Sequence, residues 1–208
     1  YHADDPKRFP AAARSRNSQK EEIVIGYTGS LYLGRAVALC DLLMACSLLD
    51  RPFRIDIYCE SVPRDIPHEL SSSSSVRFLP LPGHDDLPQA LADCDILFLP
   101  ESFDIKYKSA IELSLSTKTH LYMFSKRPIL VYGPPWSGTV DYAYRFEWGM
   151  IVDQRNIETL AEKIKIAHAS PADELTLRAY NIAMLNHNID ILRARVRRYI
   201  CDVVKITN

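Results

Sequence analysis

The feature that most constrains this chain is a set of short apolar runs that alternate with longer segments of helical periodicity. The purest runs lie within 23–27, 95–99 and 129–132, and they consist largely of Ile, Val, Leu and aromatic residues. Apolar runs of this length are typical of parallel strands that are buried on both faces. Their alternation with helical segments predicts an α/β fold, with a parallel sheet covered by helices on both faces.

About six strands are predicted in this pattern. They are expected at 23–27, 53–58, 76–83 (a strand with its exit), 95–99, 129–132 and 150–152. Helices are expected at 34–50, 87–94 and 156–168, a short one within 117–128 that ends at Pro128, and two more within 171–204. The strand at 53–58 alternates, which favours a place nearer an edge of the sheet. The handedness of crossover connections then makes a Rossmann-like strand order the leading topology.

Two of these helices have an apolar stripe at helical spacing. In the first helix the stripe is Ala36, Leu39, Cys40, Leu43, Met44 and Leu48, and in the helix after 156 it is Ile157, Leu160, Ala161, Ile164 and Ala167. We expect these faces to pack on the sheet.

The chain divides into three parts by composition. Residues 1–22 are polar and irregular and are expected to be a linker, 23–168 form the Rossmann-like domain, and 169–208 are C-terminal helices that fold back. The serine run 71–75 is low in complexity and is expected to be a disordered surface loop. Because the chain begins at Tyr1 rather than Met, we expect it to be one piece of a longer protein.

Composition limits the classes of function. With 208 residues, 47% of them hydrophobic, the chain can bury one sizeable core. A net charge of −1 gives no global attraction to nucleic acid, so any anionic ligand must be held by a local site. Five widely spaced cysteines without a CxxC pair predict reduced, buried thiols and a cytoplasmic setting. No secretory signal or membrane-spanning run is visible.

In parallel α/β sheets, ligands bind outside the carboxyl ends of the strands. This rule directs attention to Gly29 and Ser30, to Gly83, and to Glu101 and Ser102, which all follow predicted strands. A glycine after a first strand is usually only a tight turn, since no GxGxxG or Walker motif is present. In the functional interpretation, Gly29 lets the backbone approach a diphosphate.

Lys118 is the principal candidate for a phosphate-binding cation. It follows Ser116 and Thr117 at a predicted helix start, where hydroxyls supply hydrogen bonds and the ammonium supplies charge. The alternative is a solvated surface lysine, and in both cases we expect partial exposure. His120 is expected to be structural or solvated, because no second His or Cys lies at metal-ligand spacing. The sequence therefore predicts no metal site.

The last helix carries the basic cluster Arg193, Arg195, Arg197 and Arg198. Such a cluster is usually a solvated face, and docking on a partner domain or a membrane surface is the alternative. A membrane-peripheral position of a full-length protein is therefore left open.

Four phrases, in this order, resemble the C-terminal, nucleotide-sugar-binding domain of retaining group 1 glycosyltransferases of the GT-B fold. They are 25–31, 93–100, the Ser116-Thr117-Lys118 phrase with Tyr122 and Pro128, and 149–152 followed by a helix. The resemblance covers roughly 23–166. It implies a donor site for a nucleoside diphosphate sugar, which is a substrate, without any cofactor. The implied donor-binding residues are Gly29, Ser30, Arg35, Gly83, Glu101, Ser102, Ser116, Thr117, Lys118 and Tyr122, and no catalytic residue is assigned.

The chain departs from the family pattern at informative places. Leu121 stands where the family has a glutamate that holds the ribose hydroxyls, and leucine cannot accept a hydrogen bond. Ser30 and Leu33 stand where an arginine and a lysine often contact the diphosphate, and Arg35 is the nearest cation.

The resemblance implies one half of a catalytic cleft in polysaccharide-type biosynthesis, with an acceptor-binding domain N-terminal to Tyr1. The main alternative is a degenerate, non-catalytic Rossmann-like module for binding or assembly, which Leu121 favours. A weaker alternative is another GT-B enzyme on nucleotide-sugars, such as an epimerase.

Overall fold

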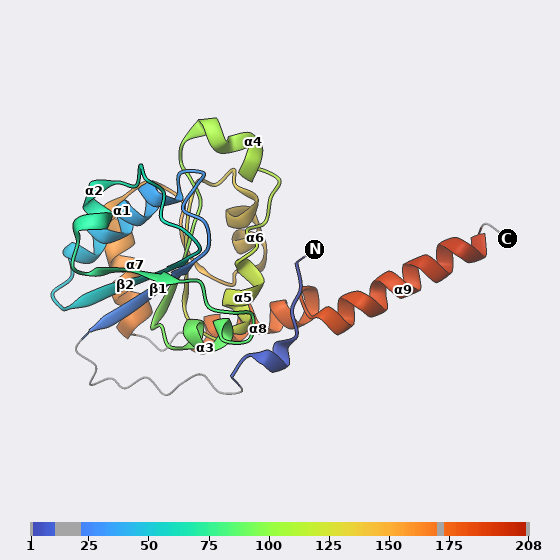
Figure 1. Ribbon diagram of the computed structural model, residues 1–208. Helices are drawn as coiled ribbons and strands as arrows, with labels where there is room; N and C mark the ends of the chain where they lie inside the picture. Colours follow the sequence, from blue (N-terminus) through green and yellow to red (C-terminus); the bar gives the residue numbers. More distant parts are fainter. Residues whose placement is uncertain (1, 11–21, 170–172, 207–208) are drawn as a thin grey trace.

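The computed structural model describes residues 2–10, 22–169 and 173–206 (Figure 1). Within these residues the sheet has six strands: β1 (Ile23–Thr28), β2 (Phe53–Cys59), β3 (Val76–Pro80), β4 (Ile96–Pro100), β5 (Ile129–Tyr132) and β6 (Met150–Val152). All neighbouring strands are parallel, in the order β3-β2-β1-β4-β5-β6. The predicted Rossmann-like sheet is therefore confirmed, and β2 lies second from the edge formed by β3.

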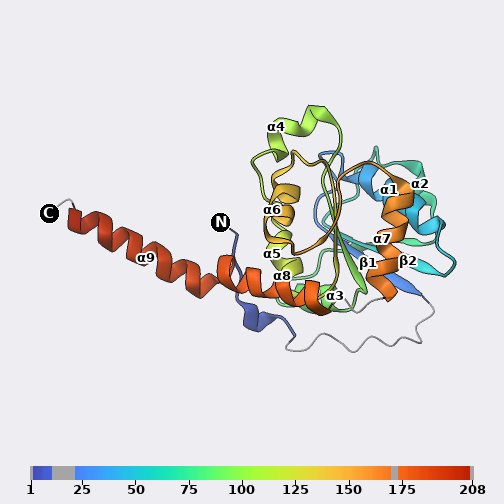
Figure 2. The same ribbon diagram turned by 180° about the vertical axis from the view of Figure 1, so that it is seen from behind.

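Helices cover both faces of this sheet (Figures 1 and 2). They are α1 (Arg35–Ser47), α2 (His68–Ser72), α3 (Leu87–Ala92), α4 (Lys108–Ile111), α5 (Thr119–Phe124), α6 (Gly138–Phe146), α7 (Ile157–Ala169), α8 (Asp173–Asn186) and α9 (Ile189–Ile206). The sequence analysis did not predict α6. Its start was nevertheless readable, because the Ser137 side chain accepts a hydrogen bond from Val140 N at 3.2 Å as an N-cap.

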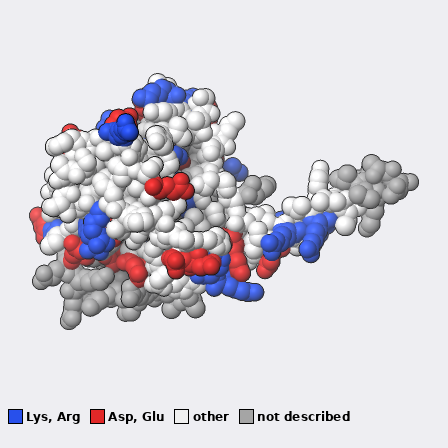
Figure 3. Space-filling model, viewed as in Figure 1, with Lys and Arg blue, Asp and Glu red and all other residues white. Residues whose placement is uncertain are grey.

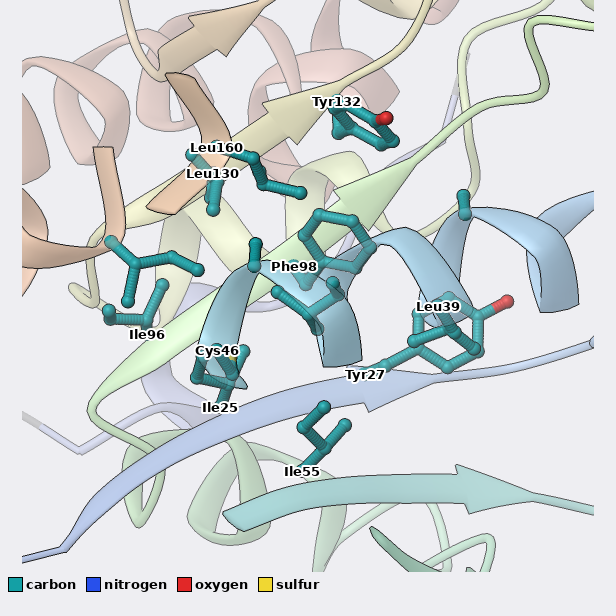
Figure 4. Close-up of a cluster of buried hydrophobic side chains, with 14 of the residues drawn as sticks. Ile25, Tyr27, Leu39, Cys46, Ile55, Ile96, Phe98, Leu130, Tyr132 and Leu160 are labelled. Atoms are coloured by element: carbon teal, nitrogen blue, oxygen red, sulfur yellow. The ribbon is translucent and has the colours of Figure 1, made fainter. Parts of the chain in front are cut away.

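Strand side chains alternate between two hydrophobic cores. On the side of α1 and α7, Ile25, Tyr27, Phe98 and Tyr132 are buried with α-helical leucines such as Leu39 (Figure 4). On the side of α5, α6 and α8, the intervening strand residues are buried, and they include Val24, Leu97, Leu99, Ile129 and Val131. The side chains on both faces of these strands are buried, and for this reason the strands are continuous apolar runs in the sequence.

The predicted stripe of α1 is wrong in part. Met44 and Leu48 are 48% and 49% exposed, while Leu42, Ala45 and Cys46 are buried. This helix is apolar around most of its circumference, so periodicity alone does not select the buried face. The α7 stripe is confirmed, since Leu160, Ala161, Ile164 and Ala167 are buried and Ile157 packs on the same core.

The serine run 71–75 is a second correction. Ser71 and Ser72 belong to α2, and their hydroxyls donate to the His68 carbonyl at 3.1 and 2.8 Å. Leu70 is fully buried and fixes this short helix on the α1 side of the sheet. Burial of that one leucine outweighs the low helix propensity of serine, which the composition of the run could not reveal.

The N-terminal segment 2–10, here called the arm, packs on the domain. Its 3-10 turn (Pro6–Arg8) is followed by Phe9, which is buried against Phe124 with ring centroids 5.3 Å apart. Asp4 N donates to the His187 carbonyl at 3.0 Å, at the junction between α8 and α9. Residues 11–21 lie outside the described residues, so most of the predicted linker stays a prediction.

The two C-terminal helices behave differently. Helix α8 packs along α5, and Ala179 and Ala183 are buried there. Helix α9 then projects away from the sheet (Figures 1 and 2). Only its first turns approach the arm, where Ile189 N donates to the Asp4 carbonyl.

Candidate functional site

A cavity of about 350 Å³ lies at the carboxyl end of β1. β1 pairs with β2 on one side and β4 on the other, so the crossovers diverge at this point and leave a crevice above the strand ends. The cavity is lined by His2, Thr28, Gly29, Ser30, Arg35, Leu81, Leu87, Ser114, Leu115, Ser116, Thr117, Lys118 and Leu121. The cavity therefore lies at the strand ends to which the topological rule directed attention.

The loop after β1 forms the floor of the cavity. Gly29 has φ +111°, and its N–H donates to the Tyr58 carbonyl at 2.8 Å. A Cβ atom at this position would lie 3.0 Å from Lys118 Cε. The glycine is thus required both by the backbone conformation and by the close approach of the lysine.

Two tyrosines hold this loop in place. The Tyr27 hydroxyl donates to the Ser30 carbonyl, and the Tyr122 hydroxyl accepts from Thr28 N at 2.9 Å. Burial raises the pKa of Tyr122 well above its ordinary value, so the phenol stays neutral. Tyr122 is fully buried behind the loop, and the structure does not bring it into the cavity lining.

Lys118 is buried, with 7% of its surface exposed, which corrects the expectation of partial exposure. Its side chain lies over Gly29, and its Nζ lies 5.3 Å from the centre of the Tyr27 ring. Among the described residues no carboxylate approaches within 4.0 Å of this ammonium. The side chain is buried because Gly29 leaves room for its stem and the aromatic ring attracts its charge.

The electrostatics of Lys118 follow from this burial. Loss of solvation, followed by the Arg35 charge, lowers the pKa of Lys118 from 10.5 to about 8, and the Glu101 charge opposes both. A cation with these neighbours is under-compensated, and its position at a cavity wall suits an anionic ligand.

Polar groups beside Lys118 are also without partners. Ser116 Oγ and Thr119 Oγ1 are buried and make no hydrogen bond to any described residue. Ser116 N donates to Thr139 Oγ1 at 3.0 Å, and Thr139 in turn donates to Glu101 Oε1 at 2.9 Å. The backbone at Ser116 is therefore fixed from α6, while its hydroxyl remains free at the cavity wall.

Glu101 forms the layer behind the lining. It is 2% exposed, and its second oxygen lies 3.3 Å from Arg35 Nη2. Arg35 is thereby turned toward the cavity by a buried carboxylate, and its Nε has no partner. Glu101 is placed to orient Arg35 rather than to contact a ligand directly.

The predicted site residues thus fall into two groups. Gly29, Ser30, Arg35, Ser116, Thr117 and Lys118 line the cavity together. Glu101 and Tyr122 support it from behind, Ser102 lines a separate cavity of about 450 Å³ beside α1, and Gly83 is exposed outside both linings. Most of the predicted residues that line the cavity come from the local phrase around Lys118 and the loop after β1, and their role in donor binding stays a prediction.

Other lining residues were missed by the sequence analysis. Leu81 and Leu87 border the exit of β3, so the strand-end rule could have found them. His2 reaches the cavity on the arm, and no local pattern indicates that contact. Arg8 donates to the His84 carbonyl, and this links the arm to the same β3 exit loop.

His120 lies in a group of three imidazoles with His2 and His187. Its ring centre is 6.0 Å from those of His2 and His187, and its Nδ1 has no partner. Burial, followed by the His187 charge, lowers the pKa of His120 to about 4, so this ring is neutral near pH 7. The described residues contain no group of His, Cys, Asp or Glu side chains arranged to hold a metal ion.

The five cysteines form no disulfide with one another; Cys46, Cys59 and Cys94 are buried, Cys40 is partly buried and Cys201 is exposed, so the expectation of buried thiols is wrong for Cys201. In the described part of the chain, no helix combines the length and apolar character needed to cross a membrane.

Comparison with solved structures gives the fold an independent basis. The chain superposes on the C-terminal domain of LpcC, a group 1 family glycosyl transferase from Francisella tularensis, with a TM-score of 0.61 and 13% identity over 90% of this chain and 100% of that one. It matches sucrose-phosphate synthase from Thermosynechococcus elongatus at a TM-score of 0.73 and 14% identity over 99% of this chain. Anabaena HepE, in complex with UDP-glucose, matches at 0.67 and 16% over 97%.

Sequence identities this low show only that the fold is shared. The chain has the architecture of a C-terminal domain of group 1 GT-B glycosyltransferases. It spans 52% of the sucrose-phosphate synthase and 56% of HepE. No protein-family model matches the sequence, and no curated protein sequence matches it either.

Proposed function

We propose that the cavity at the end of β1 binds a nucleoside diphosphate sugar, and that this chain is the donor-binding half of a glycosyltransferase. The observation that carries the proposal is the buried Lys118 ammonium over Gly29, which has no carboxylate partner among the described residues. An unpaired buried charge is costly, and a diphosphate in the cavity would supply the missing counter-charge.

The neighbouring groups suit the same ligand. The free Ser116 hydroxyl supplies a hydrogen-bond donor beside Lys118, and Arg35, oriented by Glu101, supplies a second cation. In sugar transfer the charge that develops is that of the leaving diphosphate. Fixed cations in a water-poor site stabilise this charge, and Lys118 and Arg35 would carry out that task.

Leu121 favours a second candidate, a non-catalytic module of the same fold that binds a ligand or serves assembly. The leucine lines the cavity and offers no hydrogen bond to a sugar. The two candidates differ in whether nucleoside diphosphates and their sugars bind at all.

Isothermal titration of the 208-residue chain with UDP, GDP, ADP and their glucose conjugates tests the proposal. We expect one nucleotide series to bind and its competitors to bind more weakly. Inorganic diphosphate serves as a control for charge alone. If no nucleotide gives heat at millimolar concentration, the donor-binding proposal fails and the non-catalytic module is favoured.

A further inference from the structure

Three imidazoles lie where the arm docks on the domain. His2 belongs to the arm, His120 to α5, and His187 lies at the junction between α8 and α9. The His120 ring is parallel to the His2 ring within 8°, and its centre lies 6.0 Å from the centres of both other rings. His2 also lines the cavity at the end of β1. The cluster therefore connects the docking of the arm with the wall of the candidate site.

The hydrogen bonds of His187 require its neutral form. Its Nδ1 donates to the His2 carbonyl at 2.8 Å, because a carbonyl can only accept. Its Nε2 lies 3.1 Å from the Tyr142 hydroxyl on α6, and that oxygen accepts from Asn186 Nδ2 at 3.1 Å. Burial raises the pKa of Tyr142, so the phenol keeps its proton and donates it to Nε2. A proton on Nε2 would remove this acceptor, at a residue that is only 3% exposed.

His120 has no partner for an added proton either. Its Nδ1 is buried without a hydrogen bond. Among the described residues, the one histidine with a carboxylate within 4.0 Å is His84, which lies far from this cluster in the sequence and pairs with Asp85. A charge on His120 or His187 would therefore be buried without a counter-ion in contact, which is costly.

The groups around the two rings set the direction in which acid acts. Burial is the largest cause of the low pKa of His120, about 4, and positive charge on His187 adds to it. His2 and Arg8 favour the same shift, whereas the Asp4 carboxylate opposes it. Burial also lowers the pKa of His187; the His2 carbonyl opposes this shift, and positive charge on His2 and at the amino terminus favours it.

Removal of the arm would expose both rings to water, so the released state binds protons more readily than the docked state. Docking is then at full strength above pH 6.5, the ordinary pKa of histidine, and weakens as the pH falls toward the value of about 4 for the docked His120. Acid therefore favours release.

The remaining contacts of the arm are few. Asp4 N donates to the His187 carbonyl and Ile189 N donates to the Asp4 carbonyl, both at 3.0 Å. Phe9 is buried, and no residue of 2–10 belongs to the six-stranded sheet. Segments with few backbone hydrogen bonds open at a lower free energy than the core does. The arm can therefore leave its position while the domain stays folded.

We propose that the arm is an acid-released strap over the cavity at the end of β1. Protonation of His120 and His187 undocks residues 2–10, withdraws His2 from the cavity lining and opens the cavity toward solvent. Near neutral pH the strap is docked. The consequence for ligand access rests on the function proposed above, whereas release of the arm itself needs no ligand.

Hydrogen–deuterium exchange of the 208-residue chain at pH 7.5 and pH 5.0, followed by mass spectrometry, measures the release. Exchange in residues 2–10 is compared with exchange in β1 and α6, which corrects for the intrinsic effect of pH on exchange. We expect protection of the arm to fall by about ten- to thirty-fold, as titration of His120 between 6.5 and about 4 requires, while β1 and α6 stay protected.

Two results would overturn the inference. One is equal protection of the arm at both pH values. The other is loss of protection in β1 and α6 together with the arm, because that result shows global unfolding in place of release.

Variants of the two buried imidazoles test the cause. His120→Phe keeps a ring against His2 and removes the titrating group, and His187→Gln keeps a donor for the His2 carbonyl. We expect the double variant to hold its arm equally at both pH values. His68→Gln, at an exposed histidine of α2, is the control and should release its arm as wild type does.

A folded double variant that releases its arm in acid as wild type does would contradict the role assigned to the imidazoles. If circular dichroism shows that the double variant is unfolded, His120→Phe alone replaces it, and its arm should lose less protection at pH 5.0 than the arm of the wild type.

The nucleoside diphosphate that binds in the titrations above reports on access to the cavity. Its association rate constant, measured by stopped flow, should rise from pH 7.5 to pH 5.0 in the wild type relative to the double variant. This comparison cancels titration of the phosphates and of Lys118. An equal pH dependence of the rate in both proteins, despite a released arm, would show that the arm does not control access. Absence of binding by every nucleotide overturns the proposed function, and the exchange measurement then decides the release of the arm by itself.

Discussion

Lys118 combines a charge with a buried position. Its stem occupies the space above Gly29, its ammonium faces the Tyr27 ring, and the nearest opposing charge is already engaged with Arg35. A buried charge without its own counter-charge lowers the free energy of unfolding of the ligand-free protein. In our proposal the same arrangement provides affinity, because the ligand supplies the counter-charge.

The first prediction concerns removal of this charge. Lys118→Met keeps most of the buried stem and deletes the ammonium, so we expect nucleoside diphosphate affinity to fall by about ten- to a hundred-fold, the value of a charge-assisted hydrogen bond. Titration calorimetry measures the change. Lys165→Ala, an exposed lysine on α7 outside the lining, is the control and should bind as wild type. Wild-type affinity in a folded Lys118→Met protein would remove Lys118 from the site.

The second prediction concerns pH. The pKa of Lys118 falls from 10.5 to about 8 on folding, so below pH 8 both the folded and unfolded states carry the proton and the penalty is fully present. Between pH 8 and 10.5 the unfolded state binds more protons, and the free energy of unfolding rises with pH. Over this range the titration of Lys118 raises the free energy of unfolding by about 3 kcal/mol.

Urea denaturation at pH 7 and pH 10 checks this sign. Lys118→Met should be more stable than wild type at pH 7, and the difference should shrink at pH 10, since wild-type Lys118 is then neutral. Comparison of the two proteins cancels the titration of the remaining groups. A stability difference independent of pH would show that Lys118 keeps an ordinary pKa. Ligand affinity of the wild type should fall over the same range.

At the scale of elements, the turn from β1 to α1 positions the site more than any single helix does. Tyr27 and Tyr122 fix its backbone, and Gly29 and Gly34 both adopt positive φ. These features fix the loop in a position where its backbone at Gly29 lies close to the side chain of Lys118, at the cavity.

The third prediction follows from this turn. Gly29→Ala places a Cβ in a residue with φ +111° and 3.0 Å from Lys118 Cε, so we expect a loss of about 1–3 kcal/mol in the free energy of unfolding. Displacement of Lys118 should weaken nucleotide binding as well. Thermal denaturation and titration measure the two effects.

Gly83→Ala is the matched control, because Gly83 has no positive φ and a Cβ there would meet only Asp86 Oδ2 at 3.6 Å. Its stability and affinity should stay near wild type. A Gly29→Ala protein indistinguishable from this control would contradict the assigned role of the loop.

At the scale of the whole molecule, α9 projects away from the sheet (Figures 1 and 2). Val196, Tyr199 and Ile200 are more than half exposed, and the arginines of the basic cluster are exposed beside them (Figure 3). Arg193 lies 3.7 Å from Asp190, within the helix itself. Nothing in the described residues covers this helix beyond its first turns, so the docking alternatives for the basic cluster remain predictions.

The fourth prediction concerns activity. If the chain is one half of a transferase cleft, the 208 residues should bind the donor and yet transfer sugar negligibly, because transfer requires the acceptor to be positioned beside the donor. A coupled assay for nucleoside diphosphate release, with acceptor supplied, measures this. Donor binding without turnover agrees with the prediction, and robust turnover by this chain alone contradicts it.

The sequence by itself determined the parallel sheet and the order of its strands along the chain, and it directed attention to the strand ends where the cavity lies. The strands at 23–27, 95–99 and 129–132 were readable because residues buried on both faces have no polar alternation. The site was readable because strand ends and the Ser116-Thr117-Lys118 phrase are local features.

Only the tertiary structure decided what these residues touch. It buried Lys118 over Gly29, turned Glu101 inward against Arg35, and brought His2 and Leu81 to one cavity from distant parts of the chain. It also selected the buried face of α1, where Met44 is exposed. The physical reason is that periodicity records a residue's neighbours along the chain, whereas burial and charge compensation depend on contacts between elements far apart in sequence.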